Sequence, residues 1–447
     1  MNLKDKKVLL MGLGILGGGV ATARWLFRMG AELTITDMKD QKFLKPSLEK
    51  LKDLPSIKFV LGEHREEDFL NNDIIVVNPD VPTDSKFIRL AKEKGKQIEN
   101  ELSLFYRFCK ARNTIGITGT RGKTTVVNWT AHLWGSRIVG NSPENPFLGE
   151  GVNLGEEAKI VVEIPSFQLE LLGECIDSHG SKLAPHVAII TNLYRDHLNR
   201  HKSMEGYARA KANIFKYQDE EDFLILNKDN EWTNFFLEQK PKAKVLLFSK
   251  EDEFVFVDKS EFIKKWGEHN LLNLFASILA VKTMGVSEEK IKDLITTLPQ
   301  IKFRQEIVFD NNILEIYNDT TATSPDGTIA AINRFKSVKN LLLISGGTDR
   351  DLEFDKWAEV VDKNIKRENL ILLSGSATEK MKKSLGWGSF NEVDTLLDCV
   401  SRAVEIVGSL EGKSVILFSP SAKSFEKFKN EFDRGEQFNS IIKDIKI

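Results

Sequence analysis

The chain has 447 residues and a formal net charge of −2, with 41% hydrophobic and 29% charged residues. This balance is ordinary for a globular protein, and it lacks the basic footprint that nucleic-acid binding requires. The cysteines Cys109, Cys175 and Cys399 are too widely spaced for a disulfide framework or a zinc site, which favours a reducing compartment.

The length is sufficient for about three domains of roughly 150 residues each. The N-terminus lacks the apolar segment of a secretory signal, and no apolar run approaches the roughly 18 residues that span a bilayer. We therefore expect a cytoplasmic protein with no membrane partner. Strands that alternate with helices along the chain predict an α/β fold with parallel sheets.

The first predicted domain, residues 1–104, is Rossmann-like. A strand at residues 7–11 enters Gly12-Leu13-Gly14-Ile15-Leu16-Gly17, and a helical stretch follows. The next strand ends at Asp37, 20 residues after Gly17. This context is typical of a dinucleotide fingerprint, in which the acid binds a ribose hydroxyl. The same loop can hold the diphosphate of a UDP-sugar, and a tight turn without ligand is the third interpretation.

A second glycine loop opens the central domain, predicted over residues 105–302. An apolar strand leads into Gly119-Thr120-Arg121-Gly122-Lys123-Thr124-Thr125. In such a strand–loop–helix unit the loop amides point at phosphate oxygens, the lysine reaches the outer phosphates and the threonine hydroxyl binds Mg²⁺. The standard spacing has a glycine six residues before the lysine, where this chain has Ile117. The loop therefore predicts a triphosphate site of a compressed kind.

Polar side chains follow two further strands of the central domain. Glu163 ends the strand at residues 159–163, and Asp196 with His197 follows the strand at 187–192. Because ligands of open α/β sheets gather at the carboxyl ends of strands, Glu163 is well placed to hold Mg²⁺, with a surface acid as the alternative. For His197, ligand binding is favoured over a structural hydrogen bond. Lys211 lies in a polar helix, and its local sequence alone favours a solvated lysine.

A helix is predicted from residue 271 to 284, and His269, Asn270 and Asn273 lie at its start. A helix cap is sufficient to explain Asn270. Asn273 lies one turn further on, so both amides can face a purine ring.

The third predicted domain, residues 303–447, is again a Rossmann-like α/β unit. Strands at residues 341–344, 370–373 and 415–418 each end in a cluster of serine, glycine or proline. The run from Asn318 to Pro325 is rich in hydroxyls and is normally a turn. Arg304 and Asp319 bear on function only if this domain closes over the nucleotide.

These motifs, in this order, resemble the Mur ligases, the ATP-dependent amide-forming enzymes of peptidoglycan precursor synthesis. The resemblance covers essentially the whole chain. The matching positions are residues 119–125, Glu163, residues 192–197, Lys211, His269-Asn270 with Asn273, Arg304 and Asn318-Asp319. Within the family, the N-terminal glycine loop, the segment 165–170 and the tail 419–435 are similar to the members that add D-glutamate.

The resemblance implies ligation of glutamate, with D-glutamate expected first, to UDP-N-acetylmuramoyl-L-alanine through an acyl phosphate. It implies a monomer in the cytoplasmic stage of cell-wall synthesis, and hence a part in cell shape, division and the cell cycle. ATP is the expected substrate and two Mg²⁺ ions the expected cofactors.

The resemblance also assigns roles to residues. The catalytic group would be Lys123, Glu163, His197 and Lys211. ATP would contact Gly119, Thr120, Arg121, Gly122, Lys123, Thr124, Thr125, Asn270, Asn273, Arg304 and Asp319. The UDP-sugar would contact Gly14, Ile15, Leu16, Gly17, Asp37, Asn141 and His197. Glutamate would contact Thr323, Arg350, Ser424 and Phe432, and Mg²⁺ would contact Thr124, Glu163, His197 and a carbamylated Lys211.

The chain departs from the family pattern at three places. Thr321 stands where the family usually has a lysine, near the expected amino-acid pocket. Gly140-Asn141-Ser142-Pro143 replaces a glycine-rich segment, and Asn78-Pro79-Asp80-Val81 replaces a Ser-Pro-Gly-Ile loop. A member that adds L-glutamate or another amino acid therefore stays open as an alternative. A non-ligase nucleotide-binding protein with a dehydrogenase-like first domain is the second alternative.

Overall fold

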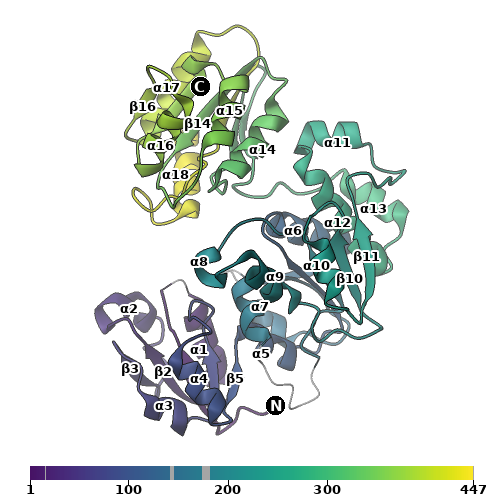
Figure 1. The fold of residues 1–447 in the computed structure, drawn as a ribbon, viewed down its shortest axis with the longest axis vertical. Helices are drawn as coiled ribbons and strands as arrows, with labels where there is room; N and C mark the ends of the chain where they lie inside the picture. The colour runs from purple at the N-terminus through teal and green to yellow at the C-terminus, as the bar shows by residue number, and fades with distance from the viewer. Residues whose placement is uncertain (16, 141–144, 174–181, 446–447) are drawn as a thin grey trace. The chain divides into compact units, whose positions relative to one another are not determined.

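The structure is a computed structural model of the 447-residue chain, and it describes all residues except 16, 141–144, 174–181 and 446–447. The described residues form three sheets with helices between their strands, which confirms the expected α/β fold class (Figure 1). The chain divides into two compact units. The first is Met1–Phe256 with Leu272–Leu298, and the second is Val257–Leu271 with Pro299–Ile447.

The first sheet has five parallel strands in the order β3-β2-β1-β4-β5. Its strands are β1 Lys7–Met11, β2 Glu32–Asp37, β3 Lys58–Leu61, β4 Ile74–Val77 and β5 Gln97–Glu99; its helices are α1 Gly18–Arg28, α2 Gln41–Glu49, α3 Glu66–Asn71 and α4 Lys86–Glu93. Strand β1 lies between β2 and β4, so the strand order reverses there. The first glycine loop therefore follows the switch point, where open α/β sheets bind ligands.

The second sheet has six parallel strands in the order β11-β10-β9-β6-β8-β7. Its strands are β6 Asn113–Thr118, β7 Arg137–Gly140, β8 Lys159–Glu163, β9 Val187–Ile190, β10 Phe223–Asn227 and β11 Lys244–Phe248. The helices around it are α5 Glu101–Phe108, α6 Lys123–Trp134, the 3₁₀ turn η1 Glu150–Asn153, α7 Ser166–Leu172, α8 Leu198–His201, α9 Met204–Ala212, α10 Thr233–Glu238, α12 His269–Thr283 and α13 Glu288–Ile295. Strand β6 lies between β8 and β9, so the loops after these three strands share one edge of the sheet.

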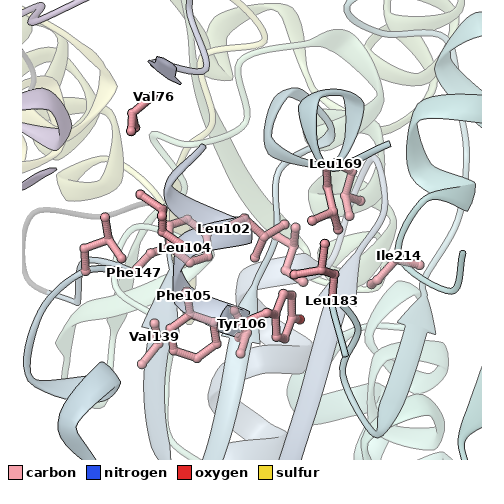
Figure 2. Close-up of a cluster of buried hydrophobic side chains, with 14 of the residues drawn as sticks. Val76, Leu102, Leu104, Phe105, Tyr106, Val139, Phe147, Leu169, Leu183 and Ile214 are labelled. Carbon is pink, nitrogen blue, oxygen red and sulfur yellow. The ribbon is translucent and has the colours of Figure 1, made fainter. Parts of the chain in front are cut away.

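Side chains of helix α5 belong to one apolar core together with side chains of the first two sheets. Figure 2 shows Leu102, Leu104 and Phe105 of this helix among side chains that include Val139 and Leu169. The three α5 side chains are fully buried, and Val76 of β4 belongs to the same cluster. This shared core is the physical reason that both glycine loops fall within one compact unit.

The third sheet has six strands in the order β12-β13-β17-β14-β15-β16. Its strands are β12 Glu306–Asp310, β13 Leu314–Asn318, β14 Asn340–Gly346, β15 Leu370–Leu373, β16 Asn391–Val393 and β17 Ser414–Phe418. The helices of this unit are α11 Lys259–Trp266, α14 Pro325–Phe335, α15 Asp355–Asn364, the turn η2 Arg367–Asn369, α16 Ser376–Leu385, α17 Leu396–Gly408 and α18 Glu431–Asp444. Alternate residues of β14 belong to two different apolar clusters, Leu341 and Leu343 to one, Leu342 and Ile344 to the other. Both faces of the sheet are therefore covered.

Two local predictions need correction. Helix α12 begins at His269, so Asn270 lies in its first turn and is not a cap residue. The Asn270 side-chain amide instead donates to the carbonyl of Trp266 at 2.8 Å. The third sheet is also not wholly parallel, because the edge strand β12 runs antiparallel to β13.

Candidate active site

The loop between β6 and α6 can be formed only with glycine at two positions. Gly119 has φ 152° and Gly122 has φ 80°, values that side chains with a Cβ rarely adopt. A Cβ at Gly119 would also lie 1.8 Å from the Thr191 hydroxyl, and one at Gly122 would lie 2.2 Å from the Asn273 amide oxygen. The compressed spacing therefore brings the loop backbone directly against Thr191 and Asn273.

Side chains that follow β9 hold this loop in place. The Arg121 amide donates to the Asn192 side-chain oxygen at 2.9 Å, and the Arg121 carbonyl accepts from the Thr191 hydroxyl at 2.7 Å. The Thr120 amide donates to the Asn192 carbonyl at 3.0 Å. Neither Thr191 nor Asn192 is among the predicted site residues. The sequence signal that could have identified them is a polar pair directly after an apolar strand. In the structure this pair anchors the phosphate loop.

Lys123 and Thr124 begin helix α6 and face different partners. The Lys123 amine donates to the carbonyls of Gly119 at 2.9 Å and Thr120 at 3.2 Å, so it folds back over the loop. The Thr124 hydroxyl donates to the Glu163 carboxylate at 3.2 Å. The structure thus brings the end of β8 next to the start of α6, as the predicted site requires.

Lys211 is buried beneath the phosphate loop. Its side chain is 1% exposed, and its amine donates to the Thr118 hydroxyl at 3.3 Å and to the Gly119 carbonyl at 2.9 Å. The interpretation as a solvated lysine, drawn from local sequence alone, is therefore wrong. Burial, assisted by the positive charge of Lys123, holds the pKa of the Lys211 amine well below its usual range. A lowered pKa increases the fraction of a lysine amine that is unprotonated and nucleophilic.

His197 stands at the start of helix α8 in an unusual backbone conformation. Its φ is 54°, and its ring meets the rings of Phe167 and Tyr207 edge-on, with centroids 5.0 and 6.0 Å apart. Asp196 approaches its Nε2 atom at 3.8 Å and approaches Arg121 of the phosphate loop at 3.6 Å. The predicted histidine therefore lies in the same neighbourhood as the loop.

His201 is a second histidine in this neighbourhood that the sequence did not single out. Its Nε2 lies 3.0 Å from the Ser166 hydroxyl, and its ring stacks on Tyr207 at 4.9 Å. Burial lowers the pKa of His201 to about 4. It is therefore neutral at physiological pH, and it packs against Tyr207, whose ring centroid lies 4.6 Å from the Lys211 amine.

The first glycine loop is held by the acid that was predicted to meet a ribose. The Asp37 carboxylate accepts hydrogen bonds from the amides of Leu13 at 2.8 Å and Gly14 at 3.0 Å. Gly14 and Gly17 have φ of 59° and 102°, and the neighbouring Ile15 is 45% exposed. In this structure Asp37 therefore shapes the loop. Leu16 and Asn141, also predicted to contact the UDP-sugar, lie outside the described residues.

Arg200 joins the loop after β4 to helix α7. Its guanidinium donates to the Val81 carbonyl at 2.7 Å and to the Glu170 carboxylate at 2.9 Å. Glu170 also accepts from the Thr83 hydroxyl at 2.9 Å. The loop Asn78-Pro79-Asp80-Val81, which departs from the family pattern, is thereby fixed to the segment 165–170 that matches it.

In the second unit, Asp319 lies buried where β13 ends. It accepts from the Ser419 hydroxyl at 2.8 Å and from the Gln305 amide at 3.1 Å. Burial raises the pKa of Asp319 to about 7, although the positive charge of Arg304 acts in the opposite direction. Arg304 and Asp319 therefore influence each other, as two residues predicted for one ligand should.

The residues predicted for glutamate follow three adjacent strands or open α18. Thr323 comes after β13, Arg350 after β14 and Ser424 after β17. The Thr323 hydroxyl accepts a hydrogen bond from the Lys423 amine at 3.1 Å. Phe432, in α18, is 54% exposed and lies 6.3 Å from the ring of Phe303. The guanidinium of the exposed Arg350 stands over the ring of Phe425 at 4.7 Å.

The donor set suits Mg²⁺ bound together with phosphate. Among the described residues, no three His, Cys, Asp or Glu side chains gather into a metal-binding group. Mg²⁺ does not need such a group, because it keeps several waters and binds one or two carboxylates together with substrate phosphates. The Thr124 hydroxyl beside the Glu163 carboxylate is a pair of this kind.

Two family models match the chain. The model "Mur ligase MurD-like, N-terminal domain" matches residues 6–100, and "Mur ligase middle domain" matches residues 117–281. The UDP-N-acetylmuramoylalanine–D-glutamate ligase of Roseiflexus sp. (strain RS-1) is 34% identical over 478 residues, which cover 99% of each chain. The ligase of the same name from Clostridioides difficile (strain 630) is 34% identical over 471 residues and the full length of both chains.

Solved structures of the same fold are more distant in sequence. MurF of Acinetobacter baumannii superposes with a TM-score of 0.58 at 14% identity, covering 91% of this chain and 90% of that one. MurF of Thermotoga maritima in complex with ADP gives a TM-score of 0.57 at 15% identity, covering 99% and 96%. No helix among the described residues is both long and apolar enough to cross a membrane.

Proposed function

We propose, because this chain belongs to the Mur ligase family, that it adds D-glutamate to UDP-N-acetylmuramoyl-L-alanine using ATP. The observation that carries the proposal is the contact set around the compressed loop, in which Lys123, Thr124, Glu163 and Lys211 come together. Full-length relatives named for D-glutamate addition support the choice of substrate. We further propose a cytoplasmic monomer, in keeping with a water-soluble nucleotide substrate.

The chemistry begins with a carboxylate that is a poor electrophile. The carboxylate of the alanyl substrate attacks the γ-phosphorus of ATP, which forms an acyl phosphate and releases ADP. The glutamate amine then attacks the acyl carbon, gives up a proton, and expels phosphate through a tetrahedral intermediate. The protein's part is to position the reactants and to balance the charge that moves between them.

The phosphate loop supplies most of that positioning. We assign the amides of residues 119–125 to the ATP phosphates, at the N-terminal end of α6. The Lys123 amine, now on the carbonyls of Gly119 and Thr120, would exchange these for the outer phosphates. Asn270, Asn273, Arg304 and Asp319 complete the proposed ATP site.

Two Mg²⁺ ions are the proposed cofactors, and they would supply positive charge to the transferring phosphoryl group. Thr124 and Glu163 would hold one, and His197 would help to hold the other. We assign Lys211 to the same centre in carbamylated form. Its buried amine, whose lowered pKa favours the unprotonated form, can add to CO₂ and lose a proton, which turns an N–H donor into an anionic oxygen ligand.

The remaining roles fall on the loops of the first and the third sheet. The loop at Gly14, Ile15 and Gly17, shaped by Asp37, would face the UDP diphosphate. Thr323, Arg350, Ser424 and Phe432 would surround the incoming glutamate. The boundaries 1–104, 105–302 and 303–447 stay our proposal for the domains that carry these substrates.

The proposal is tested by product release from the purified chain. ADP and phosphate should appear only when UDP-N-acetylmuramoyl-L-alanine and an amino acid are both present, and D-glutamate should exceed L-glutamate in an amino-acid panel. A higher rate with L-glutamate would select the alternative family activity. Thermal stabilisation by NADH and not by UDP would instead support a dehydrogenase-like nucleotide-binding protein.

A further inference from the structure

Lys423 links the loop after β17 to the loop after β13. Lys423 lies after β17, and its backbone is fixed by two hydrogen bonds with Thr348, at 2.8 and 3.1 Å. From this fixed point its half-buried side chain reaches the Thr323 hydroxyl at 3.1 Å. The partners are 100 residues apart in sequence, so the contact is a product of the fold.

A second cation in the region, Arg434, donates its hydrogen bonds to groups of the protein itself. It is fully buried, and it donates to the Thr320 hydroxyl at 2.9 Å and the Thr320 carbonyl at 2.8 Å. It also donates to the carbonyls of Ala422 and Lys423 at 3.2 Å. A substrate carboxylate could reach this guanidinium only by displacing carbonyls that would then be buried without partners. Arg434 therefore fixes the two loops and leaves recognition of the substrate to other cations.

Position 321 offers no positive charge. The Thr321 hydroxyl donates to the carbonyl of Phe303 at 2.8 Å, so it serves the loop backbone. Beside Lys423, the Ser424 hydroxyl is 2% exposed and has no hydrogen-bond partner among the described residues. A buried hydroxyl without a partner costs free energy unless a ligand satisfies it. An anionic acceptor at this place would accept from the Ser424 hydroxyl and be attracted by the charge of Lys423.

We propose that Lys423 binds a carboxylate of the incoming amino acid and supplies the cation that position 321 lacks. This inference rests on the proposed function, since it adds a second cation, besides Arg350, to the proposed amino-acid site. The Thr323 hydroxyl orients the Lys423 amine by accepting its hydrogen bond. The Ser424 hydroxyl adds a second donor to the same carboxylate. Ammonium–carboxylate hydrogen bonds are about twice as strong as neutral ones, so this lysine should weigh heavily in glutamate affinity.

The test is a KM comparison for three variants. Lys423→Met should raise the KM for glutamate roughly 10- to 100-fold, the range expected for losing a charged hydrogen bond. Lys423→Arg should recover much of that loss, and Lys423→Glu should be worse than methionine. KM values for ATP and the UDP-sugar should stay within about twofold, because the role proposed for Lys423 is confined to the amino-acid site.

Lys427→Met is the matched control. This exposed lysine lies four residues further along, and its amine donates to the Ser374 hydroxyl at 2.7 Å. Its glutamate KM should equal that of the wild type, and circular dichroism should show all four variants folded. A folded Lys423→Met variant with an unchanged glutamate KM would overturn the inference alone. A wild type that uses no glutamate would overturn the proposed function itself, so the two failures are distinct.

Discussion

The Lys211 amine donates a 2.9 Å hydrogen bond to the carbonyl of Gly119, the first glycine of the phosphate loop. A lysine from α9 thus lies directly under the backbone that is proposed to cradle ATP. Burial lowers the pKa of this amine, and the Lys123 amine donates to the same carbonyl at 2.9 Å. The buried lysine and the phosphate loop therefore form one structural element.

Lys211→Ala should leave almost no ligase activity, because it removes the group proposed to become an anionic metal ligand. A short carboxylic acid added at millimolar concentration should restore part of the rate by occupying the vacated space. Lys216→Ala, at an exposed lysine just beyond the helix, is the control and should keep wild-type activity. Full activity of Lys211→Ala would remove this residue from the metal site.

Gly122→Ala should abolish ATP binding by disordering the phosphate loop. Its Cβ would meet the Asn273 amide oxygen at 2.2 Å, in addition to the strain of φ 80°. Gly135→Ala separates these effects, because Gly135 has φ 68° and nothing within 4 Å of the added Cβ. The control should lose about 1–2 kcal/mol of stability through backbone strain and still bind ATP. Calorimetric titration with ATP measures the difference, and equal ATP affinities in the two variants would contradict the close-packed loop.

Asp319→Asn should change how stability depends on pH. The pKa of Asp319 is about 7 in the folded state and about 3.9 in an unfolded chain, so folding takes up a proton between these values. The wild type therefore loses stability as the pH rises from about 4 to about 7, by up to about 4 kcal/mol at 1.36 kcal/mol per unit. Urea unfolding at several pH values should show the asparagine variant gaining on the wild type over this window only. A constant difference from pH 4 to 8 would show that Asp319 does not titrate there.

Arg434→Met should destabilise the second unit by about 2–6 kcal/mol, at about 1–3 kcal/mol for each of two buried carbonyls that lose their donor. The substitution leaves the buried carbonyls of Thr320 and Ala422 without their donor. Arg434→Lys should recover little, because one ammonium cannot reach the partners of a planar fork. Hydrogen exchange should show faster exchange in the loops after β13 and β17, while the residues of the phosphate-loop unit keep their protection. Unchanged exchange in those loops would contradict the role given to Arg434.

The sequence predicted the central strands well, because a strand buried on both faces is a short continuous apolar run. Strands β6, β9 and β17 are of this kind, and so the loops that follow them were placed correctly. The edge strands β3 and β16 were not predicted, since edge positions carry polar residues such as Lys58 and Glu392. A local sequence pattern therefore predicts a strand best where the strand is buried on both faces.

The candidate site was predicted in part. Lys123, Thr124 and Glu163 follow from a loop motif and a strand end, both local signals. The burial of Lys211 and the contact between Lys423 and Thr323 depend on partners about 90 to 100 residues away, which no local pattern records. The roles of Asn192 and Arg434 were missed for the same reason, because a polar side chain shows its backbone partners only after folding.

The most direct measurement is the rate of ADP release by the purified chain with Mg²⁺ and ATP while the other substrates are added one at a time. The account predicts release only with UDP-N-acetylmuramoyl-L-alanine and D-glutamate together, with one phosphate and one amide bond formed per ADP. ADP release at the same rate without the UDP-sugar would contradict the claim that ATP is used here to activate its carboxylate.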